Sequence, residues 1–289
     1  MKRIVIEGIS SDNNTIIVDK YKLLFGLNIN TKFYIRNCLR KYFDKDTKSE
    51  YEIEKSIKTN VLINDKYIDL KQYNYVEMFD LYDLKDDIKL GTKSLLLKYF
   101  DLYLDKIEYN DLFISTNNIL KALESEVELN LDLESFNIIG EFIDLSKKSL
   151  LKMIELNVIK EELETSTYLL SYEEILNLQL ELIKKIAKLD NTKEYIALVD
   201  IPVLSNNLLN KIKHEIDNLT ILVFSYLTDN SENIETNNIA IVDKDIIDLY
   251  NHEQLYEISI TINKNLSINE LKEKLKQEHV LSINEVVKN

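Results

Sequence analysis

The chain has 289 residues, a formal net charge of -14 at pH 7 and 45% hydrophobic residues. This balance is typical of a globular protein and excludes an intrinsically disordered chain, and the single cysteine excludes an intrachain disulfide. No apolar run approaches the ~18 residues needed to span a bilayer, and the N-terminus lacks a signal-peptide core, so we expect a cytoplasmic protein with no membrane partner.

The N-terminal part of the chain predicts strands followed by one helix. Short segments rich in β-branched or aromatic residues predict strands at 2–8, 15–19 and 21–26. Residues 31–43 predict a helix with one apolar face. A polar stretch follows, and a further strand is expected at 66–70.

The middle of the chain, from about residue 76 to 189, has helical periodicity. Apolar residues recur at helical spacing in 93–107, 146–163 and 171–189. Strand-like segments then return at 194–200, 219–224, 238–243 and 256–262, with a helix expected at 205–217 and an exposed amphipathic helix closing the chain.

This order predicts an α/β fold in which a helical insertion interrupts a sheet domain. We expect a P-loop-ATPase-like sheet head, an inserted all-helical leg domain and a C-terminal helix. Their expected bounds are 1–75 with 190–265, 76–189, and 266–289.

Residues 26–33, Gly-Leu-Asn-Ile-Asn-Thr-Lys-Phe, keep the frame of the phosphate-binding loop G-x-x-x-x-G-K-[ST] between a predicted strand and a predicted helix. Gly26 and Lys32 fill the first-glycine and lysine positions. A working site also needs a distal strand that ends in an aspartate reaching the magnesium ion. The segment 194–200 has this form and ends in Asp200, so loop and distal strand occur in the expected order.

The pattern resembles one branch of the phosphate-loop ATPases, the transporter-type and chromosome-maintenance-type enzymes. Their loop reads G-x-N-G-x-G-K-[ST], which Gly26, Asn28 and Lys32 match. Their distal strand ends Asp-Glu-Pro, and their next strand ends Thr/Ser-His. This chain has Asp200-Ile201-Pro202 and Ser225-Tyr226 at those places.

The residues that would perform ATPase chemistry are replaced. Ile201 cannot polarise an attacking water, and Tyr226 replaces the histidine that would contact the γ-phosphate. Phe33 stands where a hydroxyl would bind magnesium, and Thr31 adds a Cβ where a glycine lets backbone amides close on phosphate. The sequence therefore predicts a degenerate nucleotide site, in which Lys32 pairs with Asp200 or faces another phosphate.

A decayed ATPase-like head with a helical insertion resembles the ring-forming DNA-end-binding protein of type II-A CRISPR adaptation, and its longer subfamily in particular. The resemblance spans most of residues 20 to 262. It is carried by the segments 21–43, 66–70, 193–204, 217–230 and 249–260.

The resemblance implies a non-catalytic homotetrameric ring whose positively lined channel admits double-stranded DNA ends. It also implies calcium ions that hold the helical legs and a supporting role in spacer acquisition. The implied partners are the adaptation integrase and the effector nuclease of the same locus.

The charge distribution favours DNA independently of the resemblance. Residues 1–49 hold ten basic and five acidic residues, so this segment is +5 and the remainder is -19. Lys32, Arg36 and Arg40 recur every four residues and predict a basic stripe opposite the apolar face of one helix. The expected DNA-binding residues are Lys20, Lys22, Lys32, Arg36, Arg40 and Lys41. Contacts of this kind would give sequence-independent, salt-sensitive affinity; the alternative is a solvated helix face.

Glu124, Glu126 and Glu128 are the candidate metal ligands. Clusters that offer only carboxylate oxygens suit calcium, which takes ~6–8 oxygen ligands. The alternative is that these alternating acids form the solvated edge of a short strand.

Two other functions fit the same residues. An ATPase or nucleotide kinase with an unconventional site would bind ATP through Gly26 and Lys32. A protein-binding scaffold would use the basic stripe to dock an acidic partner.

Overall fold

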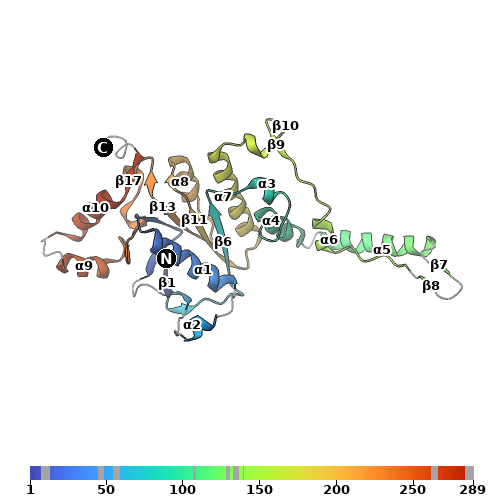
Figure 1. Cartoon of the computed structure of the whole chain (residues 1–289), viewed down its shortest axis with the longest axis horizontal. Coiled ribbons are helices and arrows are strands. Elements are labelled where there is room, and N and C mark those ends of the chain that lie inside the picture. The colour runs from blue at the N-terminus through green and yellow to red at the C-terminus, as the bar shows by residue number, and fades with distance from the viewer. Residues whose placement is uncertain are drawn as a thin grey trace. The chain divides into compact units, whose positions relative to one another are not determined.

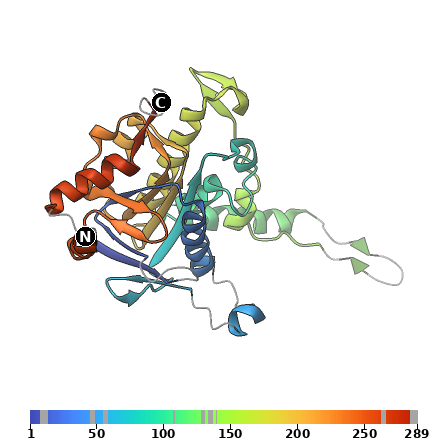
Figure 2. The same ribbon diagram turned by 60° about the vertical axis from the view of Figure 1, so that its left-hand side comes forward.

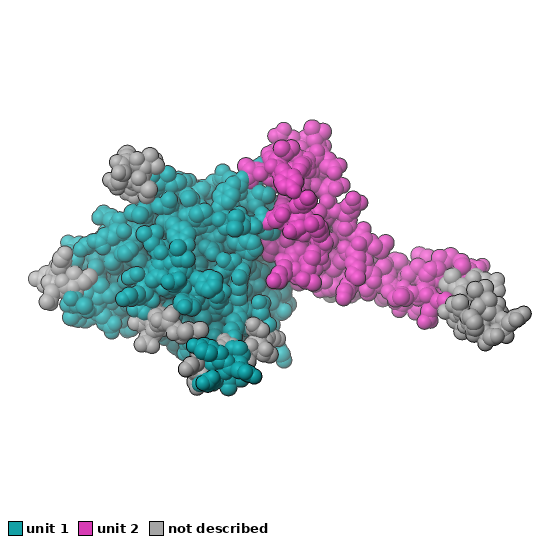
Figure 3. Space-filling model, in the orientation of Figure 1, with its two compact units in different colours: residues 1–82, 172–289 teal, residues 83–171 magenta. Residues whose placement is uncertain are grey.

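The computed structural model describes residues 1–7, 14–44, 49–54, 59–106, 109–127, 131–132, 137–138, 140–261 and 266–283. The chain forms two compact units (Figure 3). Unit 1 comprises residues 1–82 and 172–289, and unit 2 comprises residues 83–171. The described helices include none with an apolar stretch of bilayer-spanning length.

A six-stranded sheet of order β16-β15-β3-β13-β11-β6 forms the centre of unit 1 (Figure 1). The strands are β3 (Tyr21–Phe25), β6 (Tyr73–Phe79), β11 (Glu194–Asp200), β13 (Leu219–Ser225), β15 (Ile239–Val242) and β16 (Ile246–Asp248). All are parallel except β16, which pairs antiparallel with β15. Every residue of β13 is buried, as expected for a central strand covered on both faces.

Helix α1 (Ile29–Asp44) packs between this sheet and a smaller antiparallel one. The smaller sheet has the order β2-β1-β4-β5 and consists of β1 (Lys2–Glu7), β2 (Thr15–Val18), β4 (Asn60–Ile63) and β5 (Lys66–Tyr67). Ile35 and Leu39 of α1 enter one core with Leu24 and Leu222 of the large sheet and Ile4 of the small one. Burial of this apolar face is what fixes α1 beside β3.

Helices α7 (Tyr172–Leu189) and α8 (Asn206–Lys213) are the crossover helices that lead into β11 and β13. α7 packs on β6 and β11 and against α8. Gln179 of α7 is fully buried because its amide donates to the Phe79 carbonyl at 3.1 Å and accepts from the Phe79 N–H at 3.3 Å. This pair of bonds satisfies the outer edge of β6.

The rest of unit 1 surrounds the large sheet. It consists of α2 (Glu50–Glu54), α9 (His252–Thr261), α10 (Ile268–His279), the short 3₁₀ helices Ser231–Asn233 and Thr236–Asn238, and a three-stranded parallel sheet of β12 (Val203–Leu204), β14 (Leu227–Thr228) and β17 (Leu281–Ser282). Ser267 and Glu270 form a capping box at the start of α10.

Unit 2 is not all-helical as expected, because two short antiparallel strand pairs accompany its helices. Its elements are α3 (Leu84–Asp87), α4 (Leu95–Leu104), α5 (Asn110–Glu126), β7 (Leu131–Asp132), β8 (Asn137–Ile138), α6 (Lys147–Leu151), β9 (Val158–Lys160), β10 (Leu163–Thr165) and a 3₁₀ turn, Thr167–Leu169. Asp87 accepts hydrogen bonds from the Leu95 and Leu96 N–H groups and so caps α4. Lys147 pairs with Asp101 and Asp105, which joins α6 to α4.

The unit boundaries differ from the expected ones. They fall at 83 and 171 instead of 76 and 189 because β6 is the edge strand of the large sheet and α7 packs on that sheet. The C-terminal helix belongs to unit 1 and is not separate. The strand expected at 66–70 is β5 and ends at Tyr67.

The helix expected over 146–163 is wrong. It is α6 followed by the β9–β10 hairpin, whose yellow-green arrows are visible in Figure 2. The hairpin turn is formed by Glu161 and Glu162, both with positive φ. These are the conformations of a tight two-residue hairpin turn, and they interrupt any helix.

The strand expected at 256–262 is also wrong, because His252–Thr261 form helix α9. Asn251 accepts a hydrogen bond from the Gln254 N–H at the start of this helix. The Gln254 side chain then donates to the Ile246 carbonyl and accepts from the Asp248 N–H. These two β16 groups are the ones that a further strand would need.

A buried ion pair connects β3 to β16. Lys22 and Asp248 are both fully buried and pair directly, and Lys22 also donates to the Asn237 carbonyl at 2.8 Å. Asp248 accepts two backbone N–H bonds as well, from Ile17 at 2.6 Å and Tyr250 at 2.8 Å. The pair therefore joins β2, β3 and the segment after β16 at one point.

Asp248→Ala should strongly destabilise the protein, since it leaves the Lys22 ammonium buried without its counter-charge. We expect the free energy of unfolding to fall by roughly 3–5 kcal/mol. Asp217→Ala is the control, because the Lys20–Asp217 pair lies on the surface and exposed pairs contribute at most about 1 kcal/mol. Urea denaturation measures both; similar losses in the two variants would contradict the central role of the buried pair.

Candidate functional site at the carboxyl edge of the sheet

The decayed loop and its distal strand meet at the carboxyl edge of the large sheet. β13 lies between β3 and β11, and Phe25 pairs with Ser225 while Phe224 pairs with Asp200. The carboxyl edge is where open α/β sheets bind ligands. The structure thus brings Gly26, Lys32 and Asp200 to one edge.

Gly26 is required by a close backbone contact. Its φ is +134°, and a Cβ placed on it would lie 2.2 Å from the Val242 carbonyl oxygen. The glycine therefore lets β3 leave the sheet directly against the end of β15. This packing role needs no phosphate.

The other polar groups of the loop are also occupied within the protein. The Asn28 side chain caps α1 by accepting the Thr31 N–H at 3.1 Å. The Thr31 hydroxyl donates to the Asp243 carbonyl at 2.7 Å, just beyond β15. Asn28, which matches the ATPase loop, and Thr31, which replaces its second glycine, therefore both have a structural role. Asn28 caps α1, and Thr31 holds the start of α1 to the sheet.

Lys32 is buried, with only 4% of its surface exposed. Its ammonium donates to the Ser225 carbonyl at 2.9 Å and lies 3.8 Å from the centre of the Tyr226 ring, in cation–π contact. Burial lowers the pKa of Lys32 from its ordinary value of 10.5 to about 8, against the opposing effect of Asp200. The Lys32 ammonium therefore binds groups at the end of β13 within the protein.

The expected ion pair between Lys32 and Asp200 is wrong. Asp200 instead accepts a hydrogen bond from Arg36 at 3.1 Å. Burial raises the pKa of Asp200, although the charges of Arg36 and Lys32 oppose that shift.

Glu77 of β6 is the residue that sequence reasoning missed. It pairs with Arg36 at 3.2 Å, accepts two hydrogen bonds from the Arg40 guanidinium and accepts the Tyr75 hydroxyl at 2.7 Å. Burial alone would raise the pKa of Glu77, but these donors outweigh it and the pKa is lowered. An acid within the mostly apolar strand YNYVEMF was the available signal, because buried charges need partners.

The basic stripe expected on α1 is therefore not a free cationic surface. Lys32 is buried, and Arg36 and Arg40 are held by carboxylates of β6 and β11. Burial is the main cause that raises the pKa of Tyr226, and the nearby charges of Asp200 and then Asp80 raise it further. Asp80 directly follows β6. Arg36 and Arg40 thus pair with Glu77 and Asp200 at this edge, and Asp80 adds a further carboxylate nearby.

The remaining replaced positions differ in their surroundings. Ile201 is buried, and its N–H donates to the Phe224 carbonyl at 3.1 Å, so it belongs to the core. The sequence predicts that the Phe33 ring occupies the space of the magnesium ion. The ring is 57% exposed, so it does not fill a buried ion position. Neither residue offers an oxygen to a metal ion or a water.

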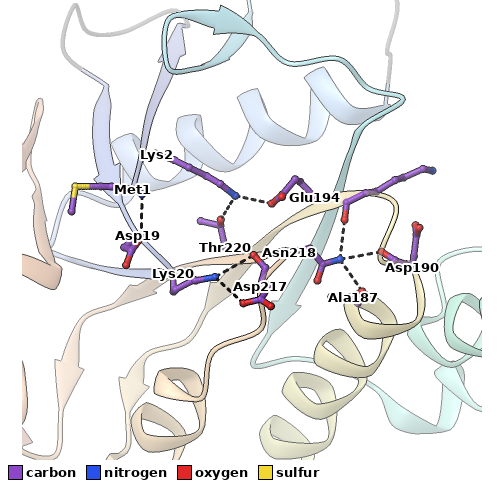
Figure 4. Close-up of polar contacts among 11 residues, drawn as sticks. Met1, Lys2, Asp19, Lys20, Ala187, Asp190, Glu194, Asp217, Asn218 and Thr220 are labelled. Atoms are coloured by element: carbon purple, nitrogen blue, oxygen red, sulfur yellow. Dashed lines mark hydrogen bonds and ion pairs between the residues drawn. The ribbon is translucent and has the colours of Figure 1, made fainter.

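Lys20 and Lys22 lie at the opposite end of β3 from Lys32. Lys20 precedes the strand and pairs with Asp217 at 3.6 Å (Figure 4), and Lys22 is buried against Asp248. Five strand residues span about 16 Å, so these lysines cannot join the α1 residues in one patch. Lys41 lies on the last turn of α1 and is half-buried.

The N-terminal charge excess is largely cancelled in space. Six of the eight described basic residues of this segment pair with acids from beyond residue 49. The pairs are Lys2–Glu194, Arg3–Asp65, Lys20–Asp217, Lys22–Asp248, Arg36–Asp200 and Arg40–Glu77. Lys45 and Lys48 lie outside the described residues.

The candidate metal residues do not form a ligand set. Glu124 and Glu126 lie on α5, two residues apart, and side chains at that spacing point to different sides of a helix. Their helical setting also rules out the strand edge considered as the alternative. Glu128 lies outside the described residues, and within the described part of the chain no group of three or more His, Cys, Asp or Glu side chains could hold a metal ion.

Comparison with known proteins gives likeness in fold only. No family model matches the sequence, and no curated protein matches it significantly. The fold is similar to that of Stu0660 of Streptococcus thermophilus, with a TM-score of 0.65 and 17% sequence identity over 95% of this chain and 84% of that chain. A structure of the recombination mediator protein RecF in the RecFOR pathway overlaps 85% of this chain and 98% of its own, with 10% identity and a TM-score of 0.35, too low to support an argument.

Gly26→Ala tests the packing role of the loop glycine. Because the added Cβ would meet the Val242 carbonyl and the backbone is in a region that L residues avoid, we expect a loss of at least about 1–3 kcal/mol in the free energy of unfolding. Gly91→Ala is the matched control, since nothing lies within 4 Å of its added Cβ. Thermal unfolding measures both, and a tolerated Gly26→Ala would show that the contact is not tight.

Lys32→Met tests whether Lys32 is a desolvated structural cation. A lysine with a pKa of about 8 in the folded state and 10.5 unfolded destabilises the fold below pH 8, and this penalty disappears as pH rises from 8 to 10.5. The stability of wild type relative to the variant should therefore rise by roughly 3 kcal/mol over that window. Denaturant titrations at several pH values measure the difference, and a flat difference would contradict the shifted pKa.

Proposed function

We propose that this chain is a non-catalytic protein that binds double-stranded DNA ends and supports CRISPR spacer acquisition. The observation that carries the non-catalytic part is the engagement of Lys32. Its ammonium contacts the Ser225 carbonyl and the Tyr226 ring, where a working loop would present it to phosphate. The Ile201 and Phe33 side chains offer no group that could polarise a water or bind a metal ion at the two positions they occupy.

A P-loop-ATPase-like origin of the head is part of this proposal. It is supported by the strand–loop–helix order of β3, residues 26–28 and α1, and by the position of Asp200 at the end of a parallel strand near the loop. The likeness in fold to Stu0660 over 95% of the chain is consistent with a CRISPR-associated protein.

The assembly and partners of the proposal come from the family resemblance. We propose a homotetrameric ring that encloses duplex ends and acts with the adaptation integrase and the effector nuclease. Calcium is proposed for the helical unit on the same ground, and no residues are assigned to it.

An ATPase or kinase function is opposed by the internal contacts of the loop. ATP would have to displace Lys32 from Ser225 and Tyr226. Phe33 and Ile201 would still provide no side-chain ligand for magnesium or for the attacking water. The scaffold alternative uses the same basic residues as the DNA proposal, but their ligand would be an acidic protein and not DNA.

Purified protein should retain linear duplex DNA in a salt-dependent way and retain closed circles more weakly, because a ring has to be threaded from an end. Gel shifts measure retention, light scattering should give a tetramer, and titration calorimetry with Mg-ATP should give no binding heat. Equal retention of linear and closed DNA would contradict end binding. No shift at low salt would favour the scaffold, and turnover of ATP that Lys32→Ala abolishes would favour the enzyme.

A further inference from the structure

The opposite, amino-terminal edge of the large sheet gathers the lysines near the ends of α7 and α8. Residues just before the parallel strands meet there, because parallel strands start at one edge. The segments before β3, β11 and β13 are 1–2, 19–20, 181–194 and 211–217, and they hold eight lysines and six carboxylates. The segments before β6 and β15 add Lys71, Asp69 and Glu235.

Several of those charges are paired. Lys2 donates to Glu194 at 2.8 Å and Lys20 pairs with Asp217, as Figure 4 shows. Asn218 donates to the carbonyls of Ala187, Asp190 and Lys193, which ties the turn before β13 to the turn before β11. Ion pairs and hydrogen bonds thus connect the segments at this edge to one another.

Four lysines near the carboxyl ends of α7 and α8 lie at this edge, and we call them the amino-edge lysine patch: Lys184, Lys185, Lys188 and Lys211. Of these, Lys211 pairs with Glu181 at 3.2 Å. Lys184 joins the helices by donating to the carbonyls of Lys211 and His214 at the end of α8. Burial first, and then the positive charge of Lys188 and of Lys211, lowers the pKa of Lys184 despite Glu181. Lys188 and Lys211 therefore each lie close enough to affect the Lys184 ammonium.

Lys185 and Lys188 are exposed and have no carboxylate partner among the described residues. Lysines about one helical turn, ~5.4 Å, apart can reach separate phosphates of a strand that carries one charge per ~3.4 Å of axis. Exposed ammonium groups without a carboxylate partner can bind such a polyanion without breaking an existing pair.

We infer that the amino-edge lysine patch on α7 and α8, rather than the arginines of α1, contacts the phosphate backbone of duplex DNA. This inference rests on the proposed DNA binding and deepens it by assigning the contact surface. The α1 arginines already have carboxylate partners, which DNA would have to displace, whereas Lys185 and Lys188 require no such exchange.

The test is the salt dependence of binding to a labelled linear duplex, measured by fluorescence anisotropy on the full chain. Each phosphate contact contributes about 0.9 to the slope of log affinity against log salt. Lys185→Ala/Lys188→Ala should therefore reduce the slope by about 2 and lower affinity at least roughly tenfold at ~50 mM salt. The matched control is Lys148→Ala/Lys152→Ala, which removes two exposed lysines of unit 2 and should leave the slope unchanged.

The outcomes separate the inference from the proposed function. Wild-type binding with an unchanged slope in the patch variant would overturn the inference alone, as would an equal loss in the control, which would indicate a net-charge effect. A lower melting temperature with an unchanged slope would assign the lysines to the helix macrodipole and also overturn it. No duplex binding by wild type would overturn both, and retention on anionic lipid vesicles but not on duplex would assign the patch to a membrane surface instead.

Discussion

The Glu77 carboxylate holds α1 to the carboxyl edge of the sheet. It binds Arg36 and Arg40 while Arg36 also reaches Asp200, so one helix is attached to β6 and β11 by charged hydrogen bonds. Such bonds are about twice as strong as neutral ones. Because the guanidinium groups are directed at the sheet, the polar face of α1 is part of the internal structure rather than a free surface.

The loop before α1 obeys the same constraint. Gly26 lies against β15, Thr31 is bonded to the Asp243 carbonyl, and Lys32 is bonded to the end of β13. The Asn28, Thr31 and Lys32 side chains thus each have a partner within the protein. The retained spacing of the phosphate loop is then explained by the geometry of a strand turning into a helix beside two parallel neighbours, which still needs a glycine and a long polar side chain.

Charge in this protein illustrates why a sequence segment is not a surface. The N-terminal segment is strongly basic along the chain, but its lysines and arginines meet acids that come from six later positions. The helix ends of α7 and α8 look ordinary in sequence, and yet the parallel sheet brings their lysines together with the start of β3. A polyanion is attracted by the charges that lie together on the surface, and not by the net charge of a sequence segment.

The sequence by itself determined the local elements whose patterns are strong: the buried strands β3, β11, β13 and β15, the helices α1 and α7, and the presence of an insertion before β11. It did not predict β6, which lies across the expected start of that insertion. It also located the loop and the aspartate that meet at one edge, because loop and strand-end chemistry is written in consecutive residues. Only the tertiary structure decided that residues 252–261 form a helix, that α7 belongs to the sheet unit, and which partner each charge has. The reason is that the bonds of Gln179 to Phe79 and of Glu77 to the two arginines join residues far apart in the chain, and no local periodicity records them. The bonds of Gln254 to β16 span only a few residues, but they cross from a helix to a strand edge and leave no periodic pattern either.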